Sequence, residues 1–172
     1  AVCTAILGLT KENVAKACFV TSSGVNSSYF STLKTFLDNQ AYSTSTVDLD
    51  SNNKVPNDCD ILLFVAPTTD ISEQALKKVN DYLNTAKKSN KTFVYIPAPA
   101  VIDGGTPNMD SFLEEQGIKI DNKWIYEEDN DYLTPLSPND NRLSTFDYDD
   151  SDFTDGIDSS TKVAMFDTCN IT

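Results

Sequence analysis

The sequence predicts an α/β fold, a three-layer sandwich in which helices cover both faces of a mainly parallel sheet. Strand-like and helix-like patterns alternate along the chain with short connections, which is typical of parallel sheets with helical crossovers. The run Ile61–Val65 is apolar throughout, as expected of a strand covered on both faces. The chain has 172 residues, 40% of them hydrophobic, which is enough for one buried core of ordinary size.

The first strand is predicted over residues 16–21, followed by a small polar loop over residues 22–28. The apolar residues of the next segment have the three-and-four spacing of one helical face. They are Tyr29, Phe30, Leu33, Phe36 and Leu37. Residues 42–49 alternate enough to predict a second strand, and residues 50–53 form a polar turn or loop.

A second helix is predicted after the strand Ile61–Val65, which Pro67 ends. Ser72 is a suitable N-cap, and Glu73 is favourable in the first turn of a helix. The apolar stripe of this helix consists of Ala75, Leu76, Val79, Tyr82, Leu83 and Ala86. Residues 93–96 are the next predicted strand, which Pro97 ends.

A third helix is predicted to begin at Thr106-Pro107, a cap followed by proline at the first helical position. Met109, Phe112 and Leu113 form its buried face, and Gly117 suits a left-handed C-terminal cap. Beyond it, short strands are predicted over residues 118–120 and 124–126, an acidic irregular stretch over 127–158, and a last strand over 163–166. We therefore expect one domain, residues 1–172, with a lead-in helix over 1–15, a core over 16–126 and an acidic tail over 127–172.

Charge and composition exclude several classes of function. The chain has 13 Lys and Arg against 26 Asp and Glu, a net charge of −13. Nucleic acid and anionic membrane surfaces are therefore poor partners, because affinity for both comes from basic side chains. The sequence contains no histidine. A Ser-His-Asp or Cys-His catalytic pair and a histidine-ligated zinc site are thus excluded.

The four cysteines, Cys3, Cys18, Cys59 and Cys169, lie far apart and show no C-x-x-C spacing. Four cysteines allow three disulfide pairings, and sequence alone does not choose among them. Cys18 and Cys59 adjoin apolar runs, so we expect them to be free and buried.

No run approaches the roughly 20 apolar residues of a membrane span, and no signal-peptide pattern is present. The chain begins at Ala1 without methionine, so we expect a processed or trimmed piece of a longer protein.

A ligand site is expected at the carboxyl ends of the parallel strands, which are residues 21–26, 66–69 and 97–102. The loop after the first strand is rich in small hydroxyl residues and precedes a helix, so it could hold an anion, or a flavin phosphate as in flavodoxins. The plainer interpretation is a turn that needs glycine for backbone freedom and Ser or Asn for capping. The candidate ligand-binding residues are Thr21, Ser22, Ser23, Gly24, Asn26, Pro67, Thr68 and Thr69.

A glutaminase-type cysteine hydrolase on this architecture needs a nucleophile on a sharp turn after a central strand, and a base. Residues 66–69 (Ala-Pro-Thr-Thr) hold neither cysteine nor serine, and Cys59 lies at the opposite end of the strand. Asp70 and Asp103 are the nearest carboxylates for an alternative, carboxylate-dependent enzyme. The acidic stretch 147–158 fails the calcium-loop template, because Ser151 and Phe153 occupy ligand positions. No metal or cofactor is expected.

The order of these segments resembles the gliding-motility auxiliary (GldG-like) family of ABC-type transport systems. Residues 55–73 match its pattern of a polar turn, D-x-L-hydrophobic strand, A/G-P and D-hydrophobic-S-E, and the similarity extends over roughly residues 1–130. Further matching segments are Ala5-Ile6-Leu7, residues 16–24, Asp81-Tyr82-Leu83, residues 93–96, 109–118 and 124–126. The family often has a His-Gly-Glu-like turn where this chain has Ser23-Gly24-Val25, and Gly-Gly where it has residues 88–91.

The resemblance implies a fold similar to flavodoxins and class I glutamine amidotransferases, without catalytic residues. It also implies a domain on the extracytoplasmic side of the cell membrane, anchored by spans outside residues 1–172. Its partners would be an ABC permease and an ATPase, with a small molecule as a further ligand. We therefore expect a non-enzymatic binding or scaffolding domain. The alternatives are a carboxylate-dependent enzyme acting on sugars or small molecules, and a flavodoxin-like anion or cofactor binder at residues 21–26.

Overall fold

The computed structural model describes residues 14–51, 53–85, 91–98, 102–124, 126–133, 143–146, 163–166 and 169–171. The chain divides into two compact units, residues 1–116 and 117–172, and each is described by itself below. Most of the lead-in helix expected over residues 1–15 lies outside the described residues. Within the described part of the chain, no helix is both long enough and apolar enough to cross a membrane.

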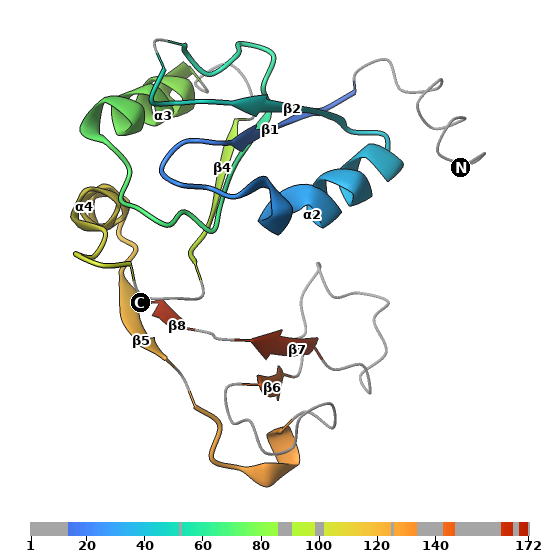
Figure 1. Ribbon diagram of the computed structural model, residues 1–172, viewed down its shortest axis with the longest axis vertical. Helices are drawn as coiled ribbons and strands as arrows, with labels where there is room; N and C mark the ends of the chain where they lie inside the picture. The colour runs from blue at the N-terminus through green and yellow to red at the C-terminus, as the bar shows by residue number, and fades with distance from the viewer. Residues whose placement is uncertain are drawn as a thin grey trace. The chain divides into compact units, whose positions relative to one another are not determined.

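The first unit is built on a four-stranded, all-parallel sheet (Figure 1). Its strands are β1 (Lys16–Val20), β2 (Ser43–Val47), β3 (Ile61–Val65) and β4 (Thr92–Ile96), in the spatial order β2-β1-β3-β4. This is the order of the first four strands in flavodoxin-like folds. The predicted α/β class with a parallel sheet is therefore confirmed.

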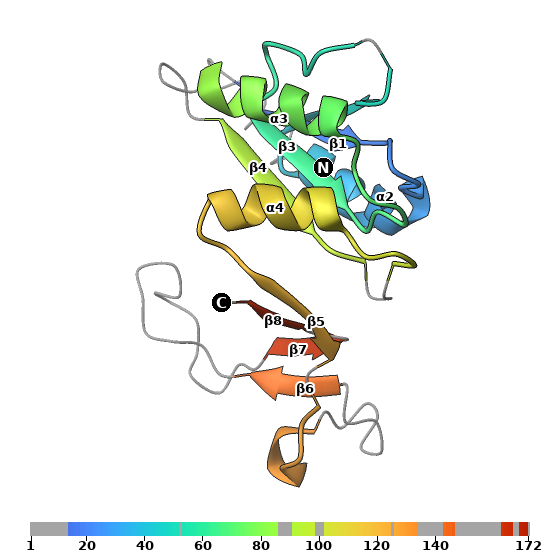
Figure 2. The ribbon, with the colours of Figure 1, turned by 90° about the vertical axis from the view of Figure 1, so that its left-hand side faces the viewer.

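Three helices flank this sheet: α2 (Ser27–Asn39), α3 (Glu73–Thr85) and α4 (Pro107–Glu115). Helix α2 covers one face, whereas α3 and α4 cover the other (Figure 2). On the α2 face, the rings of Phe19 and Phe30 stack with centroids 4.7 Å apart. On the opposite face, Phe93 of β4 and Phe112 of α4 meet edge to face at 6.1 Å. The predicted arrangement, with helices on both faces, is confirmed.

Burial along the strands follows from this layering. The two central strands, β1 and β3, bury four of their five residues each, because a helix lies against each face. Strand β2, rich in Ser and Thr, lies at one edge of the sheet and buries only Val47. The apolar core is therefore concentrated around β1 and β3, and the loops that leave these two strands start from fixed positions.

Local capping explains where the helices begin. The Oγ of Ser72 accepts a hydrogen bond from the Ala75 N–H, so the predicted cap of α3 is confirmed. Helix α4 begins at Pro107 as predicted, but the hydroxyl of Thr106 donates to the Asp110 carboxylate at 2.9 Å instead of capping the backbone. Gly117 has a φ of 77°, the left-handed conformation expected after the end of α4.

In the second unit, the described residues form two antiparallel strand pairs and a short 3-10 helix (Asn130–Tyr132). β5 (Ile120–Trp124) pairs with β8 (Cys169–Ile171), and β6 (Leu143–Phe146) pairs with β7 (Val163–Phe166). Strand β7 was predicted with these bounds. A single strand, β5, replaces the two expected over residues 118–120 and 124–126. Strand β6 lies within the stretch expected to be irregular. The acidic stretch 147–158 falls entirely outside the described residues.

Candidate functional site

Two loops that leave the carboxyl ends of β1 and β3 are joined directly. The backbone N–H groups of Thr68 and Thr69 both donate to the carbonyl oxygen of Ser23, at 3.1 and 3.2 Å. The hydroxyl of Thr68 donates to the carbonyl oxygen of Gly24 at 3.0 Å. Four of the predicted site residues, Ser23, Gly24, Thr68 and Thr69, are therefore brought together. This joined region is called the carboxyl-edge junction below.

Gly24 is required at the carboxyl-edge junction. Its φ is 69°, and a Cβ built on it would lie 2.1 Å from Oγ1 of Thr68. The close approach of the two loops therefore depends on glycine at this position, both for the backbone conformation and for the space.

A carboxylate that sequence analysis missed also belongs to the junction. Oδ2 of Asp50, in the loop after β2, accepts from the Ser23 N–H at 3.4 Å. Its Oδ1 accepts from the hydroxyl of Ser72, the cap of α3, at 3.1 Å. The sequence predicts a polar turn at Asp50. The one signal for a role at the carboxyl edge of the sheet is that Asp50 follows a parallel strand. A bound anion would need the N–H that Asp50 already occupies and would face its negative charge.

The hydroxyls of Ser22 and Ser23 lie inside the molecule. The two residues are only 5% and 7% exposed, and neither Oγ has a hydrogen-bond partner among the described residues. Ser23 also has a φ of 57°, in the left-handed region that non-glycine residues rarely adopt. Since neither oxygen reaches the surface, a ligand resting on this loop would meet backbone atoms first.

The remaining predicted residues of these loops have structural roles. Oδ1 of Asn26 accepts from the Ser28 N–H at 3.0 Å and so caps α2. The backbone N–H of Thr21 donates to the carbonyl oxygen of Val47 at 2.9 Å, which extends the pairing of β1 with β2. Pro67 is fully buried. These contacts match the plainer interpretation of the loop as a capping turn.

The residue that directly follows β3 is Ala66, and its backbone is left-handed. Its φ is 47°, it is buried, and its N–H donates to the carbonyl oxygen of Ile96 at 2.8 Å. A strained residue on a sharp turn after a central strand is where hydrolases of this architecture hold their nucleophile. Here the side chain at that position is a methyl group, which has no atom that can attack a substrate.

The two carboxylates named as enzymatic alternatives are in different surroundings. Asp70 accepts hydrogen bonds from the backbone N–H groups of Asn108 at 2.9 Å and Met109 at 3.3 Å. It therefore caps α4 and stabilises the positive end of the helix dipole. Asp103 is exposed in the loop before α4. Among the described residues, no group of three or more His, Cys, Asp or Glu could hold a metal ion.

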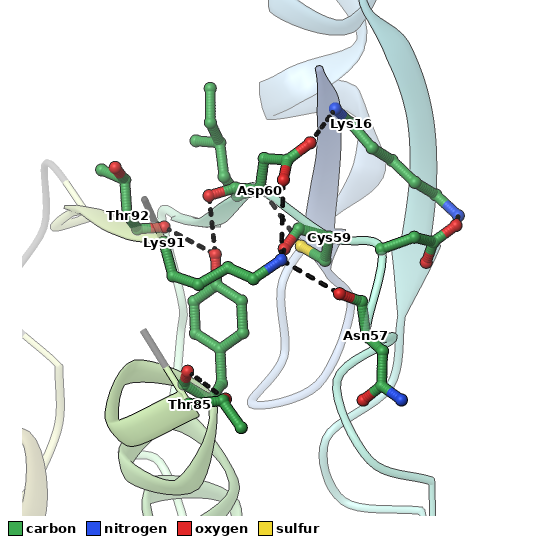
Figure 3. A network of polar contacts seen from close by, with 10 residues as sticks. Lys16, Asn57, Cys59, Asp60, Thr85, Lys91 and Thr92 are labelled. Carbon is green, nitrogen blue, oxygen red and sulfur yellow. Dashed lines mark hydrogen bonds and ion pairs between the residues drawn. The ribbon is translucent and has the colours of Figure 1, made fainter. Parts of the chain in front are cut away.

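A second polar cluster lies at the amino ends of the strands (Figure 3). The side chain of Lys91 is only 8% exposed, and its Nζ forms an ion pair with Oδ1 of Asp60 at 3.5 Å. The same ammonium donates to the carbonyl oxygen of Asn57 at 3.0 Å and to that of Cys59. These bonds hold the loop before β3 in place. Sequence analysis did not identify Lys91, because a lone lysine before a strand carries no distinctive pattern.

Tyr82 joins α3 to this amino-edge cluster. Its hydroxyl donates toward the carbonyl oxygens of Asp60 at 2.8 Å and Thr92 at 3.2 Å. Burial raises the pKa of Tyr82 above its ordinary range, so the phenol stays protonated and remains a donor. The periodicity of α3 placed Tyr82 on the apolar face, but it did not indicate that the hydroxyl reaches two strands.

The carboxyl-edge junction and the amino-edge cluster are thus two polar clusters formed by described residues of the first unit. Comparisons with models of known protein families, with curated proteins and with solved structures found no match to this chain.

Proposed function

We propose that this chain is a non-enzymatic binding or scaffolding domain of a membrane-anchored auxiliary protein of an ABC transport system. In this proposal the domain lies on the extracytoplasmic side of the membrane and works beside the permease and the ATPase of the same transport system. The observation that carries the non-enzymatic part is Ala66, whose left-handed backbone follows β3 but whose side chain is a methyl group. The ordered resemblance to the gliding-motility auxiliary family supports the transport setting.

The groups that acyl transfer requires give a second argument for a non-enzymatic domain. Acyl transfer needs a nucleophile and a base within hydrogen-bond reach. The sequence has no histidine to serve as that base. At the amino ends of the strands, Cys59 is buried in the loop before β3, at the end opposite to Ala66. Hydrolysis of the amidotransferase type therefore has neither of its two essential groups at the expected place.

The carboxyl-edge junction supports binding through shape. Its loops are fixed by Gly24, Thr68 and Asp50, so the surface above them is presented by a rigid backbone. A small-molecule ligand of this surface would carry hydroxyl or amide groups, because the predicted site residues there are uncharged and Asp50 disfavours an anion.

The proposal is tested by affinity purification of the full-length protein from detergent-solubilised native membranes, followed by mass spectrometry. We expect a permease and an ATPase at near-stoichiometric levels. The matched control is the same purification from membranes that express an equally tagged, unrelated membrane-anchored protein. Recovery of the protein alone, or only from the soluble fraction, would overturn the transport setting.

A further inference from the structure

The face of the sheet that carries α2 is only partly covered. Leu63 and Val65 of β3 belong to the core cluster beneath α2. Their register partners on β4 are Val94 and Ile96, which therefore face the same side of the sheet. Ile96 is nevertheless 41% exposed, and Val94 is only half-buried. The opposite face carries two helices, whereas this face has α2 alone among the described residues (Figure 2).

Helix α2 turns an apolar flank toward the uncovered part of the sheet. On its polar flank, the carboxylate of Asp38 accepts from the hydroxyl of Thr44 on β2 at 2.6 Å. At about 100° per residue, Tyr29, Leu33 and Phe36 lie on the other flank of the helix. That flank faces away from β2, and thus toward β3 and β4. Tyr29 and Phe36 are 58% and 56% exposed there.

These apolar side chains are called the α2–β4 surface below; they are Tyr29, Leu33, Phe36, Val94 and Ile96. The surface is continuous, because Leu33 and Val94 pack against the same core cluster. Helix α2 lies above β1 and β2, since Phe30 stacks on β1 and Asp38 is bonded to β2. Packed helices are about 8–10 Å apart and strands about 4.8 Å apart, so a neighbouring helix would lie two strands away. That place, above β3 and β4, is the α2–β4 surface.

Residues 1–13, which precede the described part of the chain, contain an apolar stripe with helical spacing. Its members recur at i, i+3, i+4 and i+7 and are Val2, Ala5, Ile6 and Leu9. The chain enters the sheet at the amino end of β1, where the carbonyl oxygen of Ala15 accepts from the Ser43 N–H at 3.0 Å. Residues 10–15 can span about 20 Å, whereas β4 lies roughly 10 Å from β1. The stripe can therefore reach the α2–β4 surface.

We propose that residues 1–13 dock on the α2–β4 surface through this stripe and complete the helical layer on that face of the sheet. Attachment favours this occupant, because a short linker gives the segment a high effective concentration at the surface. A second copy of the chain is disfavoured, because each copy carries a net charge of −13. Docking removes two exposed aromatic rings and Ile96 from water. This inference is independent of the proposed function, because it concerns only the first unit.

The test places a photo-reactive side chain on the α2–β4 surface of the full chain. Phe36 is replaced by p-benzoylphenylalanine, which keeps an aromatic ring at an exposed position. After irradiation, gel electrophoresis separates links within one chain from links between chains, and mass spectrometry of proteolytic fragments identifies the linked residues. We expect links within one chain, to residues 2–9. The matched control carries the same group at Thr35, which is exposed on the flank of Asp38, and should give little linkage to these residues.

Two substitutions within the segment make the result specific. Ile6→Asp places a charge in the stripe and should reduce linkage from position 36 about tenfold. Leu7→Asp changes an apolar residue outside the stripe and should leave the linkage nearly unchanged.

Several results would overturn the proposal. Equal linkage from positions 35 and 36 would show a segment that meets α2 without docking on one flank. Equal losses in Ile6→Asp and Leu7→Asp would show that the stripe does not carry the contact. Links only between chains would identify a second copy as the occupant, and links only to residues beyond 1–13 would identify another part of the chain. The absence of any link would show that the surface is not covered.

Discussion

At the scale of single residues, the carboxyl edge of the sheet is shaped by left-handed backbone at Ser23, Gly24 and Ala66. Only glycine adopts such a conformation without cost, and a non-glycine residue there costs about 1–2 kcal/mol. At Gly24 there is an added steric reason, since Thr68 fills the space where a side chain would be. These residues determine how closely the loops after β1 and β3 approach each other.

Replacing Gly24 with alanine should therefore be strongly destabilising. The new methyl group would conflict with Oγ1 of Thr68 in addition to the backbone cost. We expect a loss of roughly 2–4 kcal/mol in the free energy of unfolding, measured by urea denaturation.

The matched control for this change is Gly104→Ala, at a φ of 84° with nothing within 4 Å of the added Cβ. It should cost only about 1–2 kcal/mol. In a Thr68→Ala background the cost of Gly24→Ala should fall toward that of the control. Equal costs at both glycines in the unmodified chain would show that the contact with Thr68 is unimportant.

Substitutions of Asp70 and Asp103 distinguish a structural role of these carboxylates from a catalytic one. Asp70→Asn removes the charge that caps α4, so we expect a loss of about 1 kcal/mol. Asp103→Asn changes an exposed side chain and should stay within about 0.5 kcal/mol of the unmodified protein. Thermal denaturation of both variants checks this. Turnover on a panel of glycosides that either substitution abolishes would contradict the non-enzymatic proposal and favour the carboxylate-dependent alternative.

Cys18 should make stability depend on pH in the reduced protein. Its pKa in the folded state is lowered to about 7 from an ordinary 9.0, first by the hydrogen bond from Cys59, then by Ser45 and Lys16; burial and Asp58 oppose this. A lowered pKa gives stability that is present above pH 9 and is lost as the pH falls through 7. The free energy of unfolding, measured with a phosphine reductant, should therefore rise from pH 7 to 9.

Cys18→Ser is the control for this pH dependence, because it removes the titrating group and keeps a hydrogen-bonding side chain. Between pH 7 and 9, the free energy of unfolding should rise more in the unmodified chain than in Cys18→Ser. Parallel curves would show that the Cys18 pKa is not lowered in the folded protein.

At the scale of elements, the parallel sheet was predictable because β1, β3 and β4 each contain a run of apolar residues that is contiguous in the sequence. Strand β3 is apolar at all five positions, and Pro67 ends it. The antiparallel pairs were less visible. Strand β8 has only three residues, and β6 has four whose polar and apolar residues do not alternate, so neither carries the pattern of a strand. That β5 pairs with β8 depends on contacts between distant segments.

The candidate site was predictable to the same extent. The loops after β1 and β3 were expected at one edge, because the carboxyl ends of parallel strands meet there. The contact between Gly24 and Thr68, the role of Asp50 and the capping by Asp70 depend on distances between side chains. A sequence pattern carries no information about such distances.

Helix α3 is fastened to the sheet by the hydroxyl of Tyr82 as well as by its apolar face. Tyr82→Phe leaves the ring in place and removes the donor to Asp60 and Thr92. We expect a loss of about 1 kcal/mol in the free energy of unfolding. The matched control, Tyr29→Phe, removes an exposed hydroxyl from α2 and should have almost no effect. Equal effects would indicate that the bonds of Tyr82 add nothing beyond packing of its ring.

At the scale of the whole molecule, the chain consists of two units with different construction. Residues 1–116 hold the parallel sheet, its three helices and the aromatic contacts on both faces of the sheet. In the second unit, residues 117–172, the described residues form short antiparallel strand pairs and a 3-10 helix. The net charge of −13 over the full sequence disfavours binding to nucleic acid, because phosphate groups are also negative.

The first unit should fold without the second. A fragment of residues 1–116 keeps every strand of the parallel sheet and all three helices, so we expect a cooperative thermal transition and an α/β circular dichroism spectrum. A fragment of residues 1–104 lacks α4 and with it the cover over Phe93, so it should lose cooperativity. An unfolded 1–116 fragment would show that the division into units does not describe independent folding.

For protein engineering, the left-handed residue after β3 has a practical consequence. Design of a hydrolase normally begins by building a sharp turn that holds a reactive side chain and then restoring the stability lost. In this chain the turn exists already and carries a methyl group at Ala66. A serine or cysteine at this position would place a hydroxyl or a thiol on that turn. A histidine on a neighbouring loop would then supply the base. The domain is thus a starting scaffold with its most demanding backbone feature already in place.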